Sequence, residues 1–529
     1  MRGALTMTES TSSQARIVLA LWFIAIIYIL SLDLKGIWTD EGNRYRLLAG
    51  GQTWQQYNQS HSFGTSSQVI AAVGATSQYF PLFYLIDNAV IRLAKSHSDL
   101  LLRLVNVLWL MLSLQGLLRF FRNYAEPTRL FAMAIFALNG FLMMHVMQIR
   151  EYPLYLALLI WSSCLLFEIL ELPAGVSWLR TWSLLIGYGI LMGLFFYTQP
   201  YSVFALAAQL TMLLTVKTSR PAIFRLLRSY AIAAVMIAPW IIMRLRTGVN
   251  VGLWDARAPT LALLWEGLKT GFGSLLIYQS WTGHPLLQAF VAVIVIGIPA
   301  AWILEARLGT PMDPRALYAL LTAAFFFVFQ LLYFFFDQPL SLWFRYFIAY
   351  DLAFVVLASC AFSSFYNYAA KQKRGYWKVF PAALLLFVFV VGLQQVRLFR
   401  QNPFMDTSMS AACNWRAIAL AMLGHVKPEE TVVYYSPLLA WTLGVAYPLF
   451  PNELSFSDVK NPSQISGKHV LWMLDTGVVR DYTKQTLETL QSAKYSITRT
   501  AELGCQCRLY RLELRDGEAT GSEPARGVQ

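Results

Sequence analysis

Residues 16–46 read RIVLALWFIAIIYILSLDLKGIWTDEGNRYR. The run 17–32 within this stretch is apolar and bulky, and no small-x-small cleavage site follows it. We therefore interpret it as a retained membrane anchor and not as the core of a signal peptide. Two adjacent carboxylates, Asp40 and Glu41, come shortly after the anchor ends. The chain thus opens with a membrane helix that has an acidic pair beside it.

The composition is that of a membrane protein. The chain has 529 residues, of which 57% are hydrophobic and 13% charged, and its mean hydropathy is +0.48. A soluble domain of ordinary composition carries about 25% charged residues. Apolar stretches of about 18 or more residues recur, each long enough to cross a bilayer. The net charge of +13 fits basic cytoplasmic loops. Because no soluble basic face is evident, we expect no nucleic-acid partner.

The apolar pattern predicts about eleven transmembrane helices in a polytopic α-helical protein. We place them at residues 16–34, 100–118, 129–147, 152–170, 181–198, 201–216, 229–247, 285–304, 316–336, 342–363 and 377–397. If residues 1–15 form a cytoplasmic tail, four basic loops also face the cytoplasm, as the positive-inside rule expects. These loops carry Arg119, Arg122 and Arg129, then Lys217, Arg220, Arg225 and Arg228, then Arg307 and Arg315, then Lys371, Lys373, Arg374 and Lys378.

The segment 79–95, YFPLFYLIDNAVIRLAK, is apolar enough to resemble a further span. Counting it as one would invert every later loop and break the charge pattern. We therefore predict an amphipathic helix on the outer membrane surface. Its polar residues Asp87, Asn88, Arg92 and Lys95 recur at about one helical turn, which suits that position.

Two long segments, 35–99 and 248–284, then face outside, and the second contains an apolar stretch at 259–278. Long loops in compact proteins are usually functional. From residue 399 a helical pattern, a Pro-containing turn and β-branched runs predict a small extracytoplasmic α/β domain over 399–516. The tail 517–529 is expected to be disordered.

Two stretches of this domain, KHVLWMLD at 468–475 and CRLYRLEL at 507–514, predict strands. The cysteines at this end of the chain allow one disulfide with one thiol left over, and they are Cys413, Cys505 and Cys507. The histidines show no pair with metal-ligand spacing, so local sequence predicts no metal site. A metal site assembled from distant loops stays open.

Asp40 and Glu41 have two interpretations. They begin a helical pattern and could serve only as a solvated helix cap. Alternatively, an acid anchored beside a span could act as a general base on a substrate at the level of the lipid headgroups. The neighbouring acid would then bind the acceptor.

Five arginines oppose the positive-inside trend because they fall at outer span ends. They are Arg103, Arg150, Arg244, Arg246 and Arg345. Each alone could be a side chain that snorkels to the interface. Five near one plane indicate a bound anion, since arginine grips phosphate through paired hydrogen bonds.

A polar break between two spans, YTQPY at 197–201, could be a tight loop or part of a cavity that opens outward. We therefore count Gln199 and Tyr201 among the candidate cavity-lining residues. Tyr152 and Tyr346, which lie next to the arginine segments, and the arginines Arg244 and Arg246 complete that set.

The ordered motifs from about residue 16 to 450 resemble those of the GT-C glycosyltransferases, particularly bacterial members similar to protein O-mannosyltransferases and the lipid A aminoarabinose transferase. The acidic pair resembles that family's DE motif. DLLLRLVNVLWLML at 99–112, MQIREYPLYLALL at 147–159 and WFRYFIAYDLAFVVLA at 343–358 resemble its arginine-bearing segments. QYFPLFYLI at 78–86 resembles its surface helix, although the family's His-Pro start is replaced here.

This resemblance implies transfer of a sugar from a polyprenyl-phosphate donor to an acceptor at the outer face of a bacterial inner membrane. Asp40 would deprotonate the acceptor hydroxyl, and Glu41 would position the acceptor. Arg103, Arg150 and Arg345 would stabilise the leaving phosphate. A single displacement would invert the anomeric carbon, and neither nucleotide nor metal would be needed.

Two other functions remain in view. A transporter of lipid-linked saccharides would also need many spans and outward arginines, but it does not explain the acidic outer loop or the C-terminal domain. A non-catalytic assembly subunit of the cell envelope would use that domain to bind a partner. Retention of Asp40, Glu41 and Arg103 argues against the loss of activity.

Overall fold

The computed structural model describes residues 11–32, 39–52, 54–60, 62–76, 80–96, 98–173, 175–199, 201–215, 220–247, 260–277, 283–336, 347–372, 375–401, 415–434, 443, 450, 453–455, 459, 462–466, 468–475, 480–504 and 507–515. The chain divides into two compact units. One consists of Met1–Lys35 and Val69–Pro403, and the other of Gly36–Gln68 and Phe404–Gln529.

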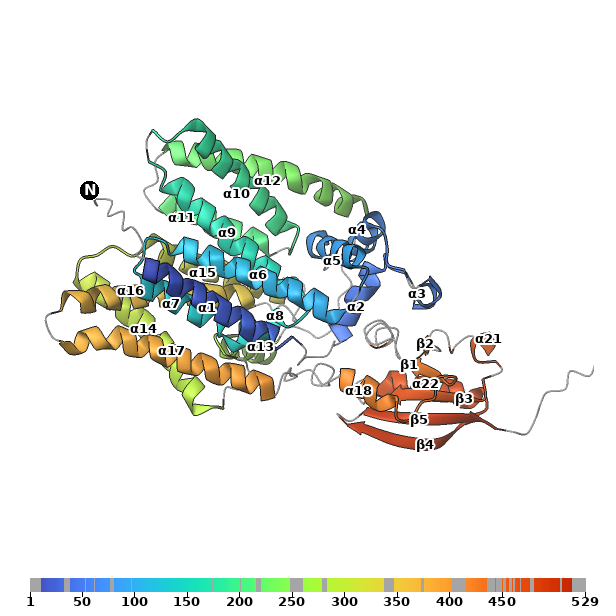
Figure 1. Cartoon of the computed structure of the whole chain (residues 1–529). Coiled ribbons are helices and arrows are strands. Elements are labelled where there is room, and N and C mark those ends of the chain that lie inside the picture. The colour runs from blue at the N-terminus through green and yellow to red at the C-terminus, as the bar shows by residue number, and fades with distance from the viewer. Residues whose placement is uncertain are drawn as a thin grey trace, which may run out of the picture. The chain divides into compact units, whose positions relative to one another are not determined.

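The first unit is helical, and its long helices lie side by side (Figure 1). In chain order the helices are α1 (Thr11–Ile29), α4 (Ser66–Gly74), α5 (Pro81–Ala94), α6 (Asp99–Phe120), α7 (Glu126–Ala137), α8 (Gly140–Val146), α9 (Tyr152–Leu170), α10 (Trp178–Phe196), α11 (Ser202–Thr215), α12 (Arg220–Thr247), α13 (Leu261–Gly273), α14 (Pro285–Arg307), α15 (Pro314–Phe336), α16 (Ile348–Lys371) and α17 (Gly375–Gln401).

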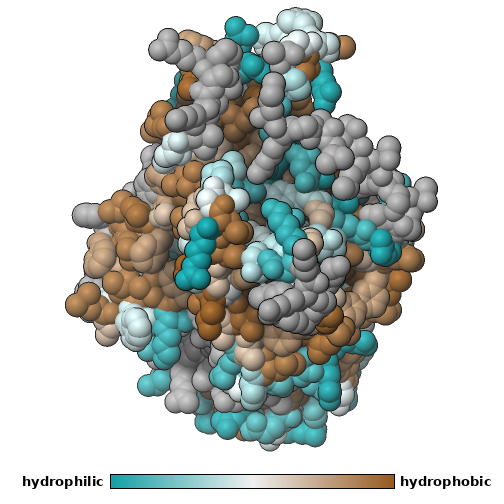
Figure 2. Space-filling model, turned by 90° about the vertical axis from the view of Figure 1, so that its left-hand side faces the viewer, coloured by the Kyte–Doolittle hydropathy of each residue, from teal (hydrophilic) through white to brown (hydrophobic). Residues whose placement is uncertain are grey.

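The predicted spans all correspond to apolar helices of this unit. Eight of the described helices are long and apolar enough to cross a membrane, and the bent pair α7 and α8 makes a ninth if it is one span. Two shorter apolar helices, Gln14–Ile29 and Ser202–Thr215, account for the remaining predictions. Figure 2 shows broad hydrophobic areas on the flanks of the molecule, as expected where helices meet lipid. The chain is a multi-pass membrane protein.

The predicted span at 129–147 corresponds to two helices instead of one. The chain bends by 60° between α7 and α8, where Asn139 and Gly140 interrupt the apolar run. Such a dipeptide is a turn signal even inside an apolar stretch. On the α7 side of the bend, the Tyr28 hydroxyl donates to the carbonyl oxygen of Ala137 at 2.7 Å.

The segment predicted as a surface helix forms α5, with Pro81 at its first turn and Lys95 as its left-handed cap at φ 51°. At 14 residues it is shorter than the spanning helices. Its polar residues do not share one water-facing stripe, however. Asp87 and Asn88 are fully buried, and only Arg92 and Lys95 are exposed, which corrects the sequence-based expectation. One side of α5 therefore packs against protein.

A charge network joins three helix ends at the end of the unit opposite α5. Both Oε atoms of Glu168 accept hydrogen bonds from Arg119, at 2.6 and 2.9 Å, and Arg122 donates to Oε1 at 2.9 Å. Arg315 of α15 pairs with Glu171 at 2.7 Å. We call these five residues the Glu168 network. It ties the ends of α6 and α9 to the start of α15.

The second unit contains α2 (Thr39–Leu48), α3 (Trp54–Ser60) and a C-terminal α/β fold. The elements of that fold are α18 (Trp415–Met422), β1 (Thr431–Tyr434), β2 (Glu453–Ser455), α21 (Pro462–Ile465), β3 (Val470–Asp475), α22 (Arg480–Ser492), β4 (Tyr495–Gly504) and β5 (Cys507–Leu514). The sheet order is β2-β1-β3-β5-β4. Strands β2, β1 and β3 are parallel, whereas β5 is antiparallel to both β3 and β4.

The core of this sheet is built from alternating apolar side chains. Val433, Leu471, Met473 and Leu512 are fully buried, and Leu490 of α22 packs against them. The predicted strands at 468–475 and 507–514 are confirmed as β3 and β5. Cys507 is a buried free thiol, while Cys413, Cys505 and the tail 517–529 lie outside the described residues.

Candidate functional site

The acidic motif forms the first turn of α2. Glu41 is fully buried, as are Arg44 and Tyr45 one turn further along the helix. Asp40 lies in the same helix, and its side chain is outside the part of the structure that is described. The motif therefore starts a helix, as its pattern predicts, but Glu41 is not a solvated cap.

Arg103 lies near the start of α6, and its side chain is 1% exposed. Its Nη1 donates to the carbonyl oxygen of Leu32 at 3.1 Å and lies 3.6 Å from an Asp99 carboxylate oxygen. Leu32 stands just beyond the end of α1, a few residues before the acidic motif. Because its guanidinium is buried, Arg103 is not a side chain that snorkels to solvent.

Asn106 lies one turn along α6 from Arg103 and is fully buried. Its Nδ2 donates to the carbonyl oxygen of Val146 at 3.3 Å and also to that of Gln148. These carbonyls belong to the last residue of α8 and to the connection that follows it, which continues directly into Arg150. Asn106 thereby fixes the arginine-bearing connection to the same end of α6 that carries Arg103.

Arg150 and Glu151 are buried, with 5% and 8% exposure. An Oε atom of Glu151 accepts a hydrogen bond from Nε2 of Gln199 at 2.9 Å. Tyr152 is buried, and its ring lies 4.8 Å from that of His145. The structure thus brings three predicted residues, Arg150, Tyr152 and Gln199, to one buried corner.

The other predicted residues have different surroundings. Nη1 of Arg244 donates to the carbonyl oxygen of Gly74 at 3.1 Å, and its guanidinium lies 5.1 Å from the Trp240 ring centroid. Arg246 is exposed and Tyr201 is half-buried. Arg345 and Tyr346 lie outside the described residues.

Sequence reasoning did not identify Asn106 or Glu151 as members of this corner. Both carried a detectable signal. Asn106 is a polar residue inside a predicted span, and Glu151 is a carboxylate in a loop too short to need charges. Such residues in or beside spans mark functional sites by default.

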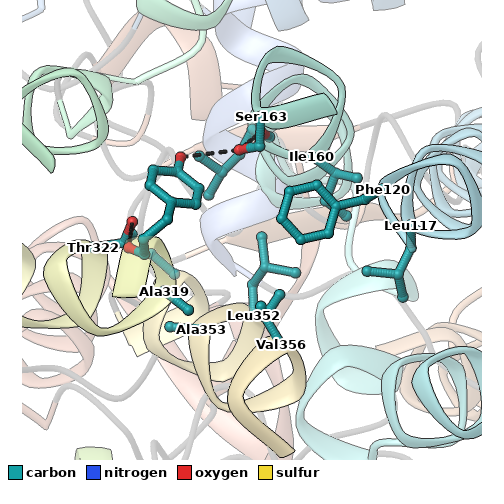
Figure 3. A pocket seen from close by; sticks show the side chains of 12 residues that line it. Leu117, Phe120, Ile160, Ser163, Ala319, Thr322, Leu352, Ala353 and Val356 are labelled. Carbon is teal, nitrogen blue, oxygen red and sulfur yellow. Dashed lines mark hydrogen bonds between the residues drawn. The ribbon is translucent and has the colours of Figure 1, made fainter. Parts of the chain in front are cut away.

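A separate cavity lies deeper among the spanning helices (Figure 3). It lies between α6, α9, α15 and α16, and its volume is about 370 Å³ when the space that opens to the outside is included. Its walls are apolar except for Thr322 and the hydroxyls of Ser163 and Tyr318, which are 2.9 Å apart. The predicted site residues do not line it, and an apolar lining does not suit a sugar phosphate.

Within the described residues, no group of three or more His, Cys, Asp or Glu side chains is placed to hold a metal ion. The sequence-based expectation that the reaction needs no metal stays a prediction.

Comparison with known proteins identifies the architecture. No family model matches the chain, and neither does any curated protein sequence. The structure of ArnT from Cupriavidus metallidurans bound to undecaprenyl phosphate is similar over 94% of this chain and 98% of its own, with TM-score 0.57 and 12% identity. Its apo structure is similar over 95% and 98%, with TM-score 0.58 and 12% identity.

A third structure shares the fold over part of a larger protein. The arabinofuranosyltransferase AftD from mycobacteria is similar over 95% of this chain and 40% of its own, with TM-score 0.51 and 12% identity. All three likenesses extend over nearly the whole of this chain and so include both of its units. This protein has the GT-C fold of the membrane glycosyltransferases.

Proposed function

We propose that this protein transfers a sugar from a polyprenyl-phosphate donor to an acceptor hydroxyl of a lipid, glycan or protein. The proposal rests on the structural similarity of this chain to ArnT, which was solved with undecaprenyl phosphate bound. The similarity covers 98% of the ArnT chain. Two buried arginines at one end of the helical unit support it, because buried cations favour a phosphate ligand.

The proposed reaction is one displacement. The acceptor oxygen attacks the anomeric carbon, and the bond from that carbon to the phosphate oxygen breaks. The electron pair leaves with the polyprenyl phosphate, and the acceptor proton passes to the Asp40 carboxylate. A phosphate leaves without protonation, so one base is enough. The configuration at the anomeric carbon is inverted.

In this proposal Arg103, Arg150 and Arg345 stabilise the charge that grows on the leaving phosphate. Glu41 positions the acceptor. The reaction needs no metal ion, and activity should therefore survive dialysis against EDTA. We further propose that the protein lies in a bacterial inner membrane, with its N-terminus cytoplasmic and its C-terminal domain outside.

The test begins by comparing glycolipids and glycoproteins by mass spectrometry in cells with and without the protein, which identifies the sugar. Purified protein is then assayed with that polyprenyl-phosphate sugar, and release of polyprenyl phosphate is measured. Asp40→Asn should abolish release, because the amide cannot accept the proton. Glu126→Gln, which alters an acid in α7 paired with Arg16, is the matched control and should retain activity.

Undiminished turnover by a normally inserted Asp40→Asn protein would contradict the assignment of the base. Movement of an intact lipid-linked saccharide across the membrane, without release of polyprenyl phosphate, would favour a transporter over a transferase.

A further inference from the structure

The backbone groups freed at the bend between α7 and α8 are satisfied by Asn139 at the bend itself and by one side chain of a distant helix. The Oδ1 atom of Asn139 accepts from the backbone N–H groups of Phe141 and Leu142, at 2.9 and 3.2 Å. The Oε1 atom of Gln395 in α17 accepts from the backbone N–H of Gly140 at 2.7 Å. A helix start inside a hydrocarbon layer needs such partners, because no water is present to supply them.

This cap fixes the orientation of the Asn139 amide. Since its oxygen serves the start of α8, its Nδ2 points away and must find an acceptor. That acceptor is Oδ2 of Asp351 in the first turn of α16, at 2.5 Å. The other carboxylate oxygen, Oδ1, accepts from the backbone N–H of Leu276 at 2.8 Å. Both neighbours of Asp351 are therefore donors.

Leu276 itself is in an unusual conformation. Its φ is 64°, in the left-handed region that costs a non-glycine residue free energy, and it is 2% exposed. It lies just beyond α13, where a Cβ on Gly271 would stand 2.2 Å from the Phe347 ring. The end of α13 and the start of α16 are thus held together by close packing and by the Asp351 carboxylate.

Asp351 joins three helix ends, one of which leads to a candidate phosphate ligand. Through Asn139 it holds the start of α8, which leads in one short helix to Arg150. Through Leu276 it holds the end of α13, and it lies itself in the first turn of α16. The positive end of the α16 dipole favours a negative charge in that turn.

We propose that Asp351 is a positioning residue that fixes the start of α8, which leads to Arg150, against the start of α16 and the end of α13, by accepting from Asn139 and Leu276 at once. The proposal rests on the phosphate-binding role given to Arg150 under the proposed function. Asp351 touches neither donor nor acceptor in this role, and acts through the two segments that it holds.

Because Asp351 only accepts and the Asn139 amide donates to it, exchanging the two residues tests whether this pair of hydrogen bonds matters. In Asp351→Asn the new amide offers one acceptor to two donors, so one buried donor loses its partner. In Asn139→Asp two carboxylates face each other. In the double variant, the carboxylate introduced at position 139 caps α8 with one oxygen and accepts from the amide introduced at position 351 with the other. The oxygen of that amide then accepts from the backbone N–H of Leu276, and every partner is restored.

The experiment uses the full chain in detergent micelles, with undecaprenyl phosphate as the probe. Affinity is measured by titration, and backbone hydrogen exchange is followed at 139–151 and 275–277. Each single variant should bind about tenfold more weakly, the loss expected for one buried unpaired group. The double variant should return close to the wild-type affinity. Ser163→Ala, which removes a buried hydroxyl bond to Tyr318 elsewhere in the unit, is the control and should bind normally.

Wild-type affinity in Asp351→Asn, or no recovery in the double variant, would overturn the positioning role. If Asp351→Asn alone does not fold, recovery of folding and affinity in the double variant supports the role, and failure to recover overturns it. If the wild-type protein does not bind the probe, the proposed function is at fault. Hydrogen exchange then decides: faster exchange at both segments in Asp351→Asn, reversed in the double variant, supports the coupling, and unchanged exchange overturns it.

Discussion

The buried cation Arg103 needs hydrogen-bond or ion-pair partners. Its guanidinium donates to a carbonyl at 3.1 Å and lies 3.6 Å from a partly exposed carboxylate, while the side chain itself is 1% exposed. Burying a charge is costly unless strong partners compensate, and a phosphate is among the strongest partners for arginine. A guanidinium held at this position is therefore suited to a phosphate ligand.

We expect Arg103→Ala to weaken binding of undecaprenyl phosphate by about ten- to a hundredfold, the value of a charge-assisted hydrogen bond. Arg103→Lys should recover only part of this, because lysine lacks the planar fork. Titration of purified protein measures both. Arg180→Ala, at an exposed position at the start of α10, is the control. If Arg103→Ala, Arg103→Lys and the control all bind with wild-type affinity, Arg103 is not part of the phosphate site.

At the residue scale, the sequence was sufficient to identify residues that break the positive-inside rule. It was not sufficient to identify residues that matter through a distant partner. Arg103 and Arg150 are visible as cations on the wrong side of the charge bias. Asn139 and Asp351 are polar residues inside predicted spans, as Asn106 is, but the sequence did not show that they are partners, because their contact joins residues 212 positions apart. Local spacing carries no information about such a pair.

At the scale of single elements, the helices were easier to predict than their interruptions. About 20 consecutive apolar residues predict a span. The bend at Asn139 is indicated by a single dipeptide, and the hydrogen bonds that stabilise it involve α1, α16 and α17. In α5 the polar residues have helical spacing, but tertiary packing decided which of them are buried.

The edge strand β2 carries a prediction about pH. Glu453 is buried, and the Tyr434 hydroxyl of β1 donates to it at 2.9 Å. Burial raises the pKa of this carboxyl from 4.5 to about 8, with the tyrosine hydrogen bond opposing the shift. Between pH 4.5 and about pH 8, Glu453 is therefore protonated in the folded state and ionised in the unfolded state. The stability contributed by Glu453 is fully present below pH 4.5 and is lost as pH rises through about 8.

We expect protection of β1 and β2 to fall by roughly 1.4 kcal/mol per pH unit in the middle of this window. Hydrogen exchange in the full-length protein at about pH 5 and about pH 8, corrected for intrinsic exchange rates, measures the change. Glu453→Gln, which cannot titrate, should remove the slope. The same slope in both proteins would show that another group is responsible.

For the whole molecule, hydropathy and loop charge were sufficient to predict a multi-pass helical protein followed by a small α/β fold. The division of the chain was not predictable in the same way. Residues 36–68 follow the first span directly, yet they group with 404–529. No local pattern reports a grouping between segments so far apart in sequence.

The orientation in the membrane is a prediction at this scale. The thiol of a Thr310→Cys variant, at an exposed position between α14 and α15, should react with a membrane-impermeant reagent only when the cytoplasmic face is opened. The thiol of a Lys484→Cys variant, exposed on α22, should react in cells whose inner membrane is intact. The reverse labelling of the two positions would invert the topology.

The bend between α7 and α8 also constrains the order of assembly during synthesis. Two of the side chains that hold it, Asp351 and Gln395, lie 212 and 255 residues along the chain from the groups they serve. A nascent chain that has just inserted α7 and α8 has only Asn139 and the contact from Tyr28 of α1, and contacts between distant residues form late. We therefore expect the bend to reach its fully hydrogen-bonded form only after α16 and α17 have been synthesised.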